Sequence, residues 1–159
     1  MSLDPDEFRS VLGRFASGVT VVTCTDAQGR DCGITVSAFA SLSLQPPLVV
    51  MCIDHDASTL PALMAASHFV VNILAAHQEA IARRFSMPDA EQRFEGLGFT
   101  RTQAGGAVLE DVLASLECRA VQSIPGGDHT IFVGEVETAT ARSATPLLYY
   151  RGGYSQLER

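Results

Sequence analysis

Hydroxyl side chains recur in the segment whose residue types and spacing best suit ligand binding. They occupy odd positions between residues 33 and 47, with one aromatic residue among them: Thr35, Ser37, Phe39, Ser41 and Ser43. In an extended strand these positions share one face, so hydroxyls would surround an aromatic ring. Such a face suits a flat polar ligand, for example a heteroaromatic ring with carbonyl and N–H edges. An ordinary exposed strand face has the same composition, and both interpretations stay open on spacing alone.

Two further segments could bind a phosphate group. Ser58 and Thr59 precede an apolar helical pattern, and hydroxyls and N–H groups at a helix start can bind an anion. They could equally be plain N-cap residues, which is the more ordinary role. Arg84 ends another predicted helix, where arginine usually balances the helix dipole but could reach a phosphate with bidentate geometry.

A single histidine follows a glycine-rich turn. His129 comes directly after residues 126–128 and could stand at the mouth of a pocket or be a surface loop residue. No second histidine, cysteine or carboxylate lies near it at the spacing of metal ligands, so we expect no metal site. A hydrolase using serine and His129 stays an alternative, although no GxSxG motif supports it.

The composition limits which anions the protein can hold and how. The 159 residues suit one domain, and 11 basic against 18 acidic side chains give a net charge of −7. Every basic residue is arginine, so Schiff-base chemistry and a Walker-type lysine are excluded. An acidic chain without a basic cluster also argues against nucleic-acid binding. Anions must be held by arginine, hydroxyls or backbone N–H groups.

The termini and cysteines predict an ordinary cytoplasmic protein. Residues 1–7 are acidic and do not form a signal peptide, and no apolar run approaches the roughly 20 residues of a membrane helix. We therefore expect no membrane association. The four cysteines, at positions 24, 32, 52 and 118, form no CxxC pair, which favours inert thiols over a disulfide framework or zinc site.

The elements that must position these residues are mostly strands. Strand patterns cover residues 19–24, 32–44, 48–53, 69–74, 116–124, 130–140 and 147–151. Helices are predicted at 58–66, at 78–85, and from an Asp4 cap through an apolar pattern that includes Phe15 and stops before Gly18. A polar excursion covers 89–106. Strands and helices do not alternate, and no GxGxxG follows a strand, so we expect a small, mostly antiparallel barrel with flanking helices.

Taken in order, these segments resemble the short-chain flavin reductases, the flavin-binding split-barrel reductases of two-component monooxygenases. The similarity runs over about residues 8–157 and rests on residues 15–23, 33–39, 41–49, 69–74, 84–86, 127–136 and 146–154. Each piece is weak alone, and their order and spacing together are specific.

This resemblance implies one domain over residues 1–159, mainly β with flanking helices. It implies a homodimeric, antiparallel six-stranded split barrel with flavin at the dimer interface. By position, the flavin ring would meet Thr35, Val36, Ser37 and Ala38, with Ser41, Leu42 and Ser43 nearby. The ribityl chain and phosphate would meet Cys52, Ile53, Asp54, Ser58, Thr59, Arg84, Phe85 and Ser86. The nicotinamide site would include His129 as the catalytic residue, bordered by Tyr149, Arg151, Gly152 and Tyr154.

The function implied is an NAD(P)H-dependent flavin reductase that supplies reduced flavin to a monooxygenase component. Hydride would pass from NADH or NADPH to FMN or FAD, with both choices open. The chain departs from the family where Asp54, His55 and Asp56 replace a more basic pair, because two carboxylates would repel a flavin phosphate. The alternative is a non-catalytic flavin- or heme-binding split-barrel carrier or sensor.

Overall fold

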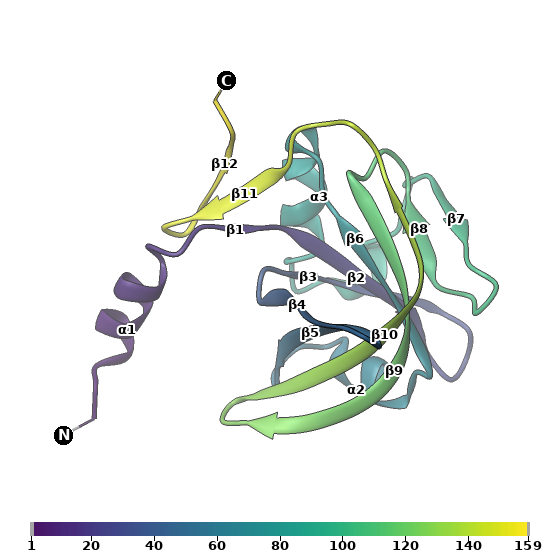
Figure 1. Ribbon diagram of the computed structural model, residues 1–159, viewed down its shortest axis with the longest axis horizontal. Coiled ribbons are helices and arrows are strands. Elements are labelled where there is room, and N and C mark those ends of the chain that lie inside the picture. The colour runs from purple at the N-terminus through teal and green to yellow at the C-terminus, as the bar shows by residue number, and fades with distance from the viewer. Residues whose placement is uncertain (1, 159) are drawn as a thin grey trace.

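The computed structural model describes residues 2–158 and is dominated by one curled antiparallel sheet (Figure 1). The sheet has seven strands in the spatial order β3-β2-β6-β9-β10-β5-β4. Their bounds are Thr20–Thr25 for β2, Asp31–Val36 for β3, Phe39–Leu44 for β4, Pro47–Asp54 for β5, His68–Ile73 for β6, Ala114–Gly126 for β9 and His129–Ala141 for β10. All neighbouring strands are antiparallel, which confirms the mainly β, antiparallel class.

The main sheet has seven strands, where the resemblance implied six. The stretch predicted as one strand over residues 32–44 breaks in the middle. The N–H of Phe39 donates to the carbonyl of Ser37, 2.9 Å away, in a tight bend that interrupts the ladder. The chain before the bend is β3 and the chain after it is β4, so the two edges of the sheet are consecutive strands. The N–H of Cys52 on β5 donates to the carbonyl of Ala38 at 3.0 Å and holds the bend against the sheet.

The hydroxyl-bearing residues therefore do not form the single strand face that alternation predicts. The bend separates Thr35 from the residues of β4, and a register shift between Ser41 and Ser43 breaks the alternation again. The side chains that line a ligand site must come from both sides of the bend.

Two apolar cores hold the sheet. The core enclosed by the sheet includes Val22, Met51, Ile53, Phe69, Val71 and Phe132. The second core packs against the opposite side of β2 and includes Val19, Val21, Leu74, Phe85, Leu109 and Leu147. Because both faces of β2 are covered, nearly every residue of this strand is buried. Its sequence is therefore a continuous β-branched and apolar run without the alternation of a half-exposed strand.

Smaller elements surround the sheet. A three-stranded sheet joins β1 (Ser17–Gly18), β11 (Leu147–Tyr150) and β12 (Gly153–Gln156), and a hairpin pairs β7 (Phe99–Arg101) with β8 (Ala107–Leu109). The helices are α1 (Pro5–Leu12), α2 (Leu60–Ala65) and α3 (Glu79–Arg84), with short 3-10 turns η1 (Ala76–Gln78) and η2 (Ala90–Gln92). None of the helices in residues 2–158 is long and apolar enough to cross a membrane.

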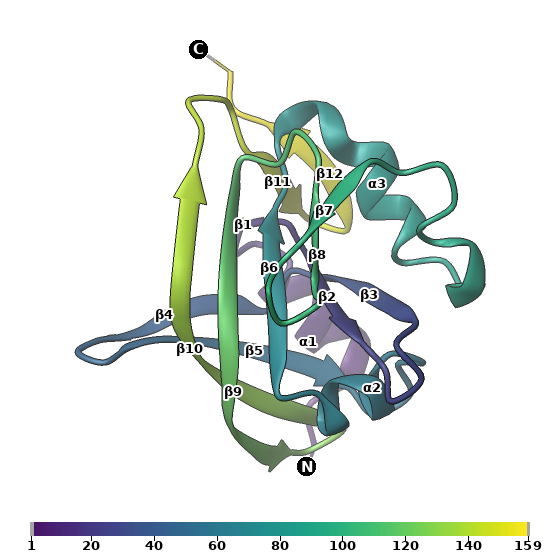
Figure 2. The same ribbon diagram turned by 90° about the vertical axis from the view of Figure 1, so that its right-hand side faces the viewer.

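The N-terminal helix stands away from the body of the molecule (Figure 1). Its predicted cap is confirmed, since the Asp4 carboxylate accepts from the N–H groups of Asp6 and Glu7. The helix ends at Leu12, so the prediction that it continues through Phe15 is wrong. No residue of α1 is buried, and Phe15 is 81 % exposed. The β4–β5 hairpin also projects from the sheet (Figure 2) and exposes Leu44.

Candidate functional site

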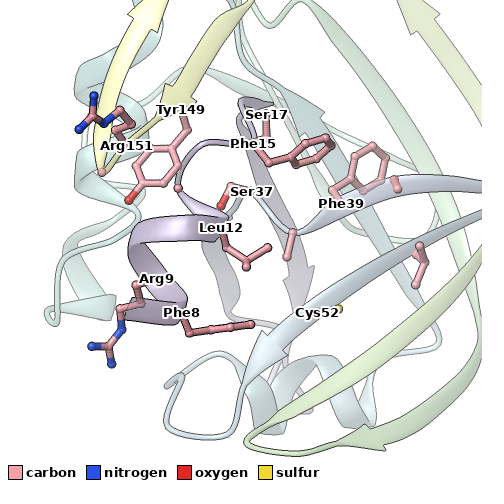
Figure 3. A pocket seen from close by; sticks show the side chains of 15 residues that line it. Phe8, Arg9, Leu12, Phe15, Ser17, Ser37, Phe39, Cys52, Tyr149 and Arg151 are labelled. Atoms are coloured by element: carbon pink, nitrogen blue, oxygen red, sulfur yellow. The ribbon is translucent and has the colours of Figure 1, made fainter. Parts of the chain in front are cut away.

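A cavity of about 720 Å³ lies between α1, the bend after β3, β5 and the turn that joins β11 to β12. Its apolar lining includes Phe8 and Leu12 from α1 and Phe39 from the start of β4. The side chain of Ser37 reaches it from the bend and that of Cys52 from β5 (Figure 3). An apolar cavity of this size with a few polar groups is typical of a small-molecule site.

Two smaller cavities extend this one along β3. One of about 160 Å³ shares Ser37 and Tyr149 with the first cavity. Another of about 440 Å³ shares Thr35 and Ser86 with the second. We call the three together the β3 groove, lined at its far end by Asp56, Ala57, Ser58, Phe85, Met87, Pro88 and Arg93. The groove is wide and apolar at α1 and has a mixed, more polar lining at the opposite end, which suits a ligand with a flat ring and an anionic tail.

The fold brings many of the predicted site residues into this groove. Those that line it are Thr35, Ser37, Ala38, Cys52, Ser58, Phe85, Ser86, Tyr149, Arg151, Gly152 and Tyr154. They come from β3, the bend, β5, the loop before α2, the end of α3, and β11 with β12 and the turn between them.

Other predicted site residues lie outside the lining. They are Val36, Ser41, Leu42, Ser43, Ile53, Asp54, Thr59 and Arg84. Val36 and Ile53 are buried in the enclosed core. The Thr59 hydroxyl is also buried and donates to the carbonyl of Gly33 at 3.2 Å. The Arg84 guanidinium donates to the carbonyls of Gln92 and Glu95.

The bend after β3 leaves backbone donors beside the large cavity. Ser37 and Ala38 belong to no strand, and within the described chain neither N–H donates a hydrogen bond to the protein. Both residues line the cavity. Both residues are exposed, so their N–H groups are open to water or to acceptor atoms of a ligand.

The middle of the groove is fixed by contacts between β3 and the end of α3. The hydroxyls of Thr35 and Ser86 both donate to the carbonyl of Ala82, at 2.6 Å and 2.9 Å. The Thr35 N–H donates to the carbonyl of Phe85 at 3.3 Å. With their protons committed, these hydroxyls can still accept hydrogen bonds from a ligand.

Arg93, which the sequence pattern did not single out, lies at the polar end. Its side chain comes from the 89–106 excursion and is only 5 % exposed. Nη1 donates to the carbonyl of Gly33 at 2.6 Å and to the Thr59 hydroxyl at 3.3 Å, and Nη2 donates to the carbonyl of Met87 at 2.5 Å. Nε has no hydrogen-bond partner within the described chain. Burial lowers the pKa of Arg93, while the charge of Asp89 acts in the opposite direction.

His129 lies outside the groove lining, at the start of β10. Its Nδ1 lies 2.7 Å from the carboxylate of Asp128, and the hydrogen bond from His129 lowers the pKa of Asp128. His129 is paired in register with Asp54 on β5, the strand that carries Cys52 into the cavity. His129 therefore lies on β10, which pairs with β5, a strand that lines the large cavity.

Comparison with known proteins identifies the family. Residues 12–158 match the flavin reductase like domain. The chain is 43 % identical over 152 residues to the reductase component of a 4-nitrophenol 4-monooxygenase/4-nitrocatechol 2-monooxygenase from Rhodococcus opacus, covering 96 % of this chain and 80 % of that protein. It is 40 % identical to an FMN reductase (NADH) from Agrobacterium fabrum, covering 96 % and 86 %.

A solved structure agrees with these relatives. The NADH:FAD oxidoreductase of Streptomyces globisporus, in complex with NAD and FAD fragments, superposes with a TM-score of 0.91 at 35 % identity and covers 99 % of this chain and 97 % of that one. Since the family match spans nearly the whole chain and these relatives exceed 30 % identity, the chain belongs to the flavin reductase-like domain family.

Proposed function

We propose that this protein is an NAD(P)H-dependent flavin reductase, which passes a hydride from a nicotinamide to FMN or FAD. The observation that carries the proposal is the β3 groove, whose wide end at α1 is apolar and whose opposite end holds hydroxyls and a buried arginine. Its relatives include proteins named flavin reductase at 37 % identity over most of the chain. When bound, the flavin supplies the ring that accepts the hydride.

The residues of the groove fit such a cofactor. The free N–H groups of Ser37 and Ala38 would bind acceptor atoms on the edge of the ring. Phe8 and Leu12 of α1 would cover the ring and exclude water from it. The hydroxyls of Ser58 and Ser86 lie at the far end, where a phosphate group would sit without any lysine.

The proposal also gives roles to the other predicted site residues, including those that do not line the β3 groove. Val36, Ser41, Leu42, Ser43, Ile53, Asp54, Thr59 and Arg84 are proposed to act by supporting the lining residues or by contacting a ligand that projects from the groove. Tyr149, Arg151, Gly152 and Tyr154 are proposed to border the nicotinamide. His129 is proposed to orient the nicotinamide nucleotide. A proton-transfer group is not needed for the hydride step, because the reacting atoms belong to the two cofactors.

A homodimeric split barrel is part of the proposal. The apolar side chains that α1, the following turn and the β4–β5 hairpin leave exposed are Phe8, Val11, Leu12, Phe15, Leu42 and Leu44. They lie on two elements that project from the body of the molecule (Figures 1 and 2), and an exposed apolar area of this kind supports the proposal of an interface here. A second copy of the chain would cover it and close the wide end of the groove, placing the flavin at the interface.

The reduced flavin is proposed to leave for a monooxygenase component. Relatives of this chain are named as reductase components of such enzymes, among them the Rhodococcus opacus protein. The relatives are named for FMN in one case and FAD in another, so either flavin is a candidate.

Anaerobic mixing of the protein with FMN and NADH tests the activity directly. We expect the absorbance of oxidised flavin to disappear at a rate proportional to protein concentration, with FAD and NADPH tested in parallel. Protein-free mixtures provide the background rate. Absorbance that persists with every flavin and both nicotinamides, while the flavin binds, would instead support the non-catalytic carrier. Labelling by a serine-directed covalent probe would support the hydrolase alternative.

A further inference from the structure

We infer that Arg93 is the cation that holds the phosphate group of the flavin at the polar end of the β3 groove. This inference rests on the proposed function and deepens it. It assigns the binding of the anionic end of the ligand to Arg93, which is not among the residues predicted to contact the flavin. Arg93 lines the same cavity as Ser58 and Ser86.

The first step is that the guanidinium of Arg93 is buried with no carboxylate in contact with it. The acceptors of its Nη1 and Nη2 groups are two backbone carbonyls and one hydroxyl, which are neutral. In the described chain no carboxylate lies within 4.0 Å of it, and its Nε has no partner. A guanidinium stays protonated even when buried, so the site carries a positive charge that these contacts do not neutralise.

The second step is that each of the other described arginines is paired with a carboxylate, lies outside the groove, or is exposed. Within residues 2–158, Arg14 and Arg151 have no carboxylate partner but are exposed, and Arg151 lines the wide end of the groove near α1. Those paired with carboxylates are Arg9, Arg30, Arg83, Arg101, Arg119 and Arg142. Arg84, the sequence-based candidate, donates to the carbonyls of Gln92 and Glu95 and does not line the cavity. Arg93 combines burial, an unneutralised charge and a place in the groove.

The third step concerns the acidic residues around this end of the groove. Asp56 lines the same cavity, and the negative charge of Asp89 also reaches Arg93. A phosphate entering here meets a repelling carboxylate, so binding requires a compensating cation close by. Arg93 supplies it, which accounts for how the chain tolerates the acidic 54–56 segment.

The test compares FMN with riboflavin, which has the same ring and lacks the phosphate. Dissociation constants of both are measured by quenching of flavin fluorescence for the wild type and for Arg93→Gln. We expect Arg93→Gln to weaken FMN binding by about 30-fold or more and to leave riboflavin binding within about threefold. Arg93→Lys, which keeps the charge, should retain most of the preference for FMN.

Two further variants separate the explanations. Arg101→Gln removes an exposed arginine of the same excursion that pairs with Asp31, and it should leave the FMN-to-riboflavin ratio unchanged. Asp56→Asn leaves Arg93 intact, keeps the test usable if Arg93→Gln does not fold, and should tighten FMN binding without affecting riboflavin.

The outcomes distinguish this inference from the proposed function. Equal weakening of FMN and riboflavin in Arg93→Gln or Arg93→Lys would overturn the inference and leave Arg93 a structural clamp. Loss of the FMN preference in Arg84→Gln but not in Arg93→Gln would also overturn it, as would an Asp56→Asn protein with unchanged FMN binding. A wild type that binds both flavins equally would overturn the inference alone. A wild type that binds neither would overturn the proposed function as well.

Discussion

At this site, side chains of the same type differ in whether they line the groove. Thr59 and Thr35 are both threonines near the groove, yet the Thr59 hydroxyl is buried against Gly33 while Thr35 lines the cavity. Arg84 and Arg93 differ in the same way, since one guanidinium turns toward carbonyls outside the cavity and the other lines it. Residue type alone therefore does not identify which group meets a ligand.

His129 provides a prediction at the residue scale. If its imidazole orients the nicotinamide nucleotide, His129→Ala should raise the apparent KM for NADH by about 3- to 10-fold, the effect of losing one modest hydrogen bond. The dissociation constant for FMN should stay unchanged. Asp128→Asn is the matched control for the contact between the two side chains. Unchanged steady-state kinetics in His129→Ala would remove the proposed role.

The cysteines provide a second residue-scale prediction. Burial raises the pKa of the Cys24 thiol and that of the Cys118 thiol to about 12. At pH 8 their reactive thiolate forms amount to about one part in ten thousand. Iodoacetamide should leave both unmodified in the native protein, and mass spectrometry after digestion would show this.

Cys52 is the internal comparison in the same experiment, because it lines the large cavity. We expect it to be alkylated faster than Cys24 and Cys118, and more slowly once FMN is added. Protein unfolded in guanidinium should react at all four cysteines. Native alkylation of Cys24 at the rate seen in denaturant would contradict its burial.

The elements around the groove meet at Gly33. A Cβ added there would lie 2.6 Å from Cε1 of Phe85 and 3.2 Å from Cζ of Phe94. The two rings pack edge to face, and Phe85 is fully buried, so neither can move freely. The Gly33 carbonyl also accepts from Arg93, which joins β3 to the 89–106 excursion.

Gly33→Ala should therefore destabilise the protein by about 1–3 kcal/mol, the usual effect of overpacking a filled core. Urea denaturation would measure the free energy of unfolding. Gly18→Ala in β1 is the control, because an added Cβ there meets nothing within 4 Å, and its effect should stay within about 0.5 kcal/mol. Equal stability of Gly33→Ala and wild type would mean that the rings can shift.

For the whole molecule, the exposed position of α1 is the feature on which the proposed dimer rests. The helix packs no buried residue of its own, and Phe8 is 53 % and Leu12 51 % exposed although both line the large cavity. A helix this short is marginal in water without tertiary packing. A second copy of the chain would give it that packing.

Phe8→Asp with Leu12→Asp should convert the protein from dimer to monomer in light scattering coupled to gel filtration. Flavin binding should weaken in the same variant, since the cavity would lose its cover. Ser10→Asp adds a charge to the exposed opposite side of α1 and should leave the dimer intact. A wild type that is monomeric at all concentrations would rule out the dimeric form of the proposal.

Local sequence signals predicted the elements that depend on neighbours along the chain. The Asp4 cap, the β9–β10 hairpin and the strand pattern near residues 69–74 are confirmed, because capping groups, turn residues and β-branched runs act over short separations. The break between β3 and β4 was missed. An extended hydroxyl-rich run gives no signal for a bend that the N–H of Cys52 holds from another strand.

By itself, the sequence determined a mainly β protein and its family, and it predicted a site around residues 35–38 in which any phosphate would be bound without lysine. The tertiary structure decided that β3 and β4 form opposite edges of a seven-stranded sheet and that Arg93 is the buried, unneutralised arginine of the groove. The physical reason is that burial and pairing depend on distant segments. The hydrogen bond from Arg93 to Gly33 joins residues 60 positions apart, and no local pattern encodes it.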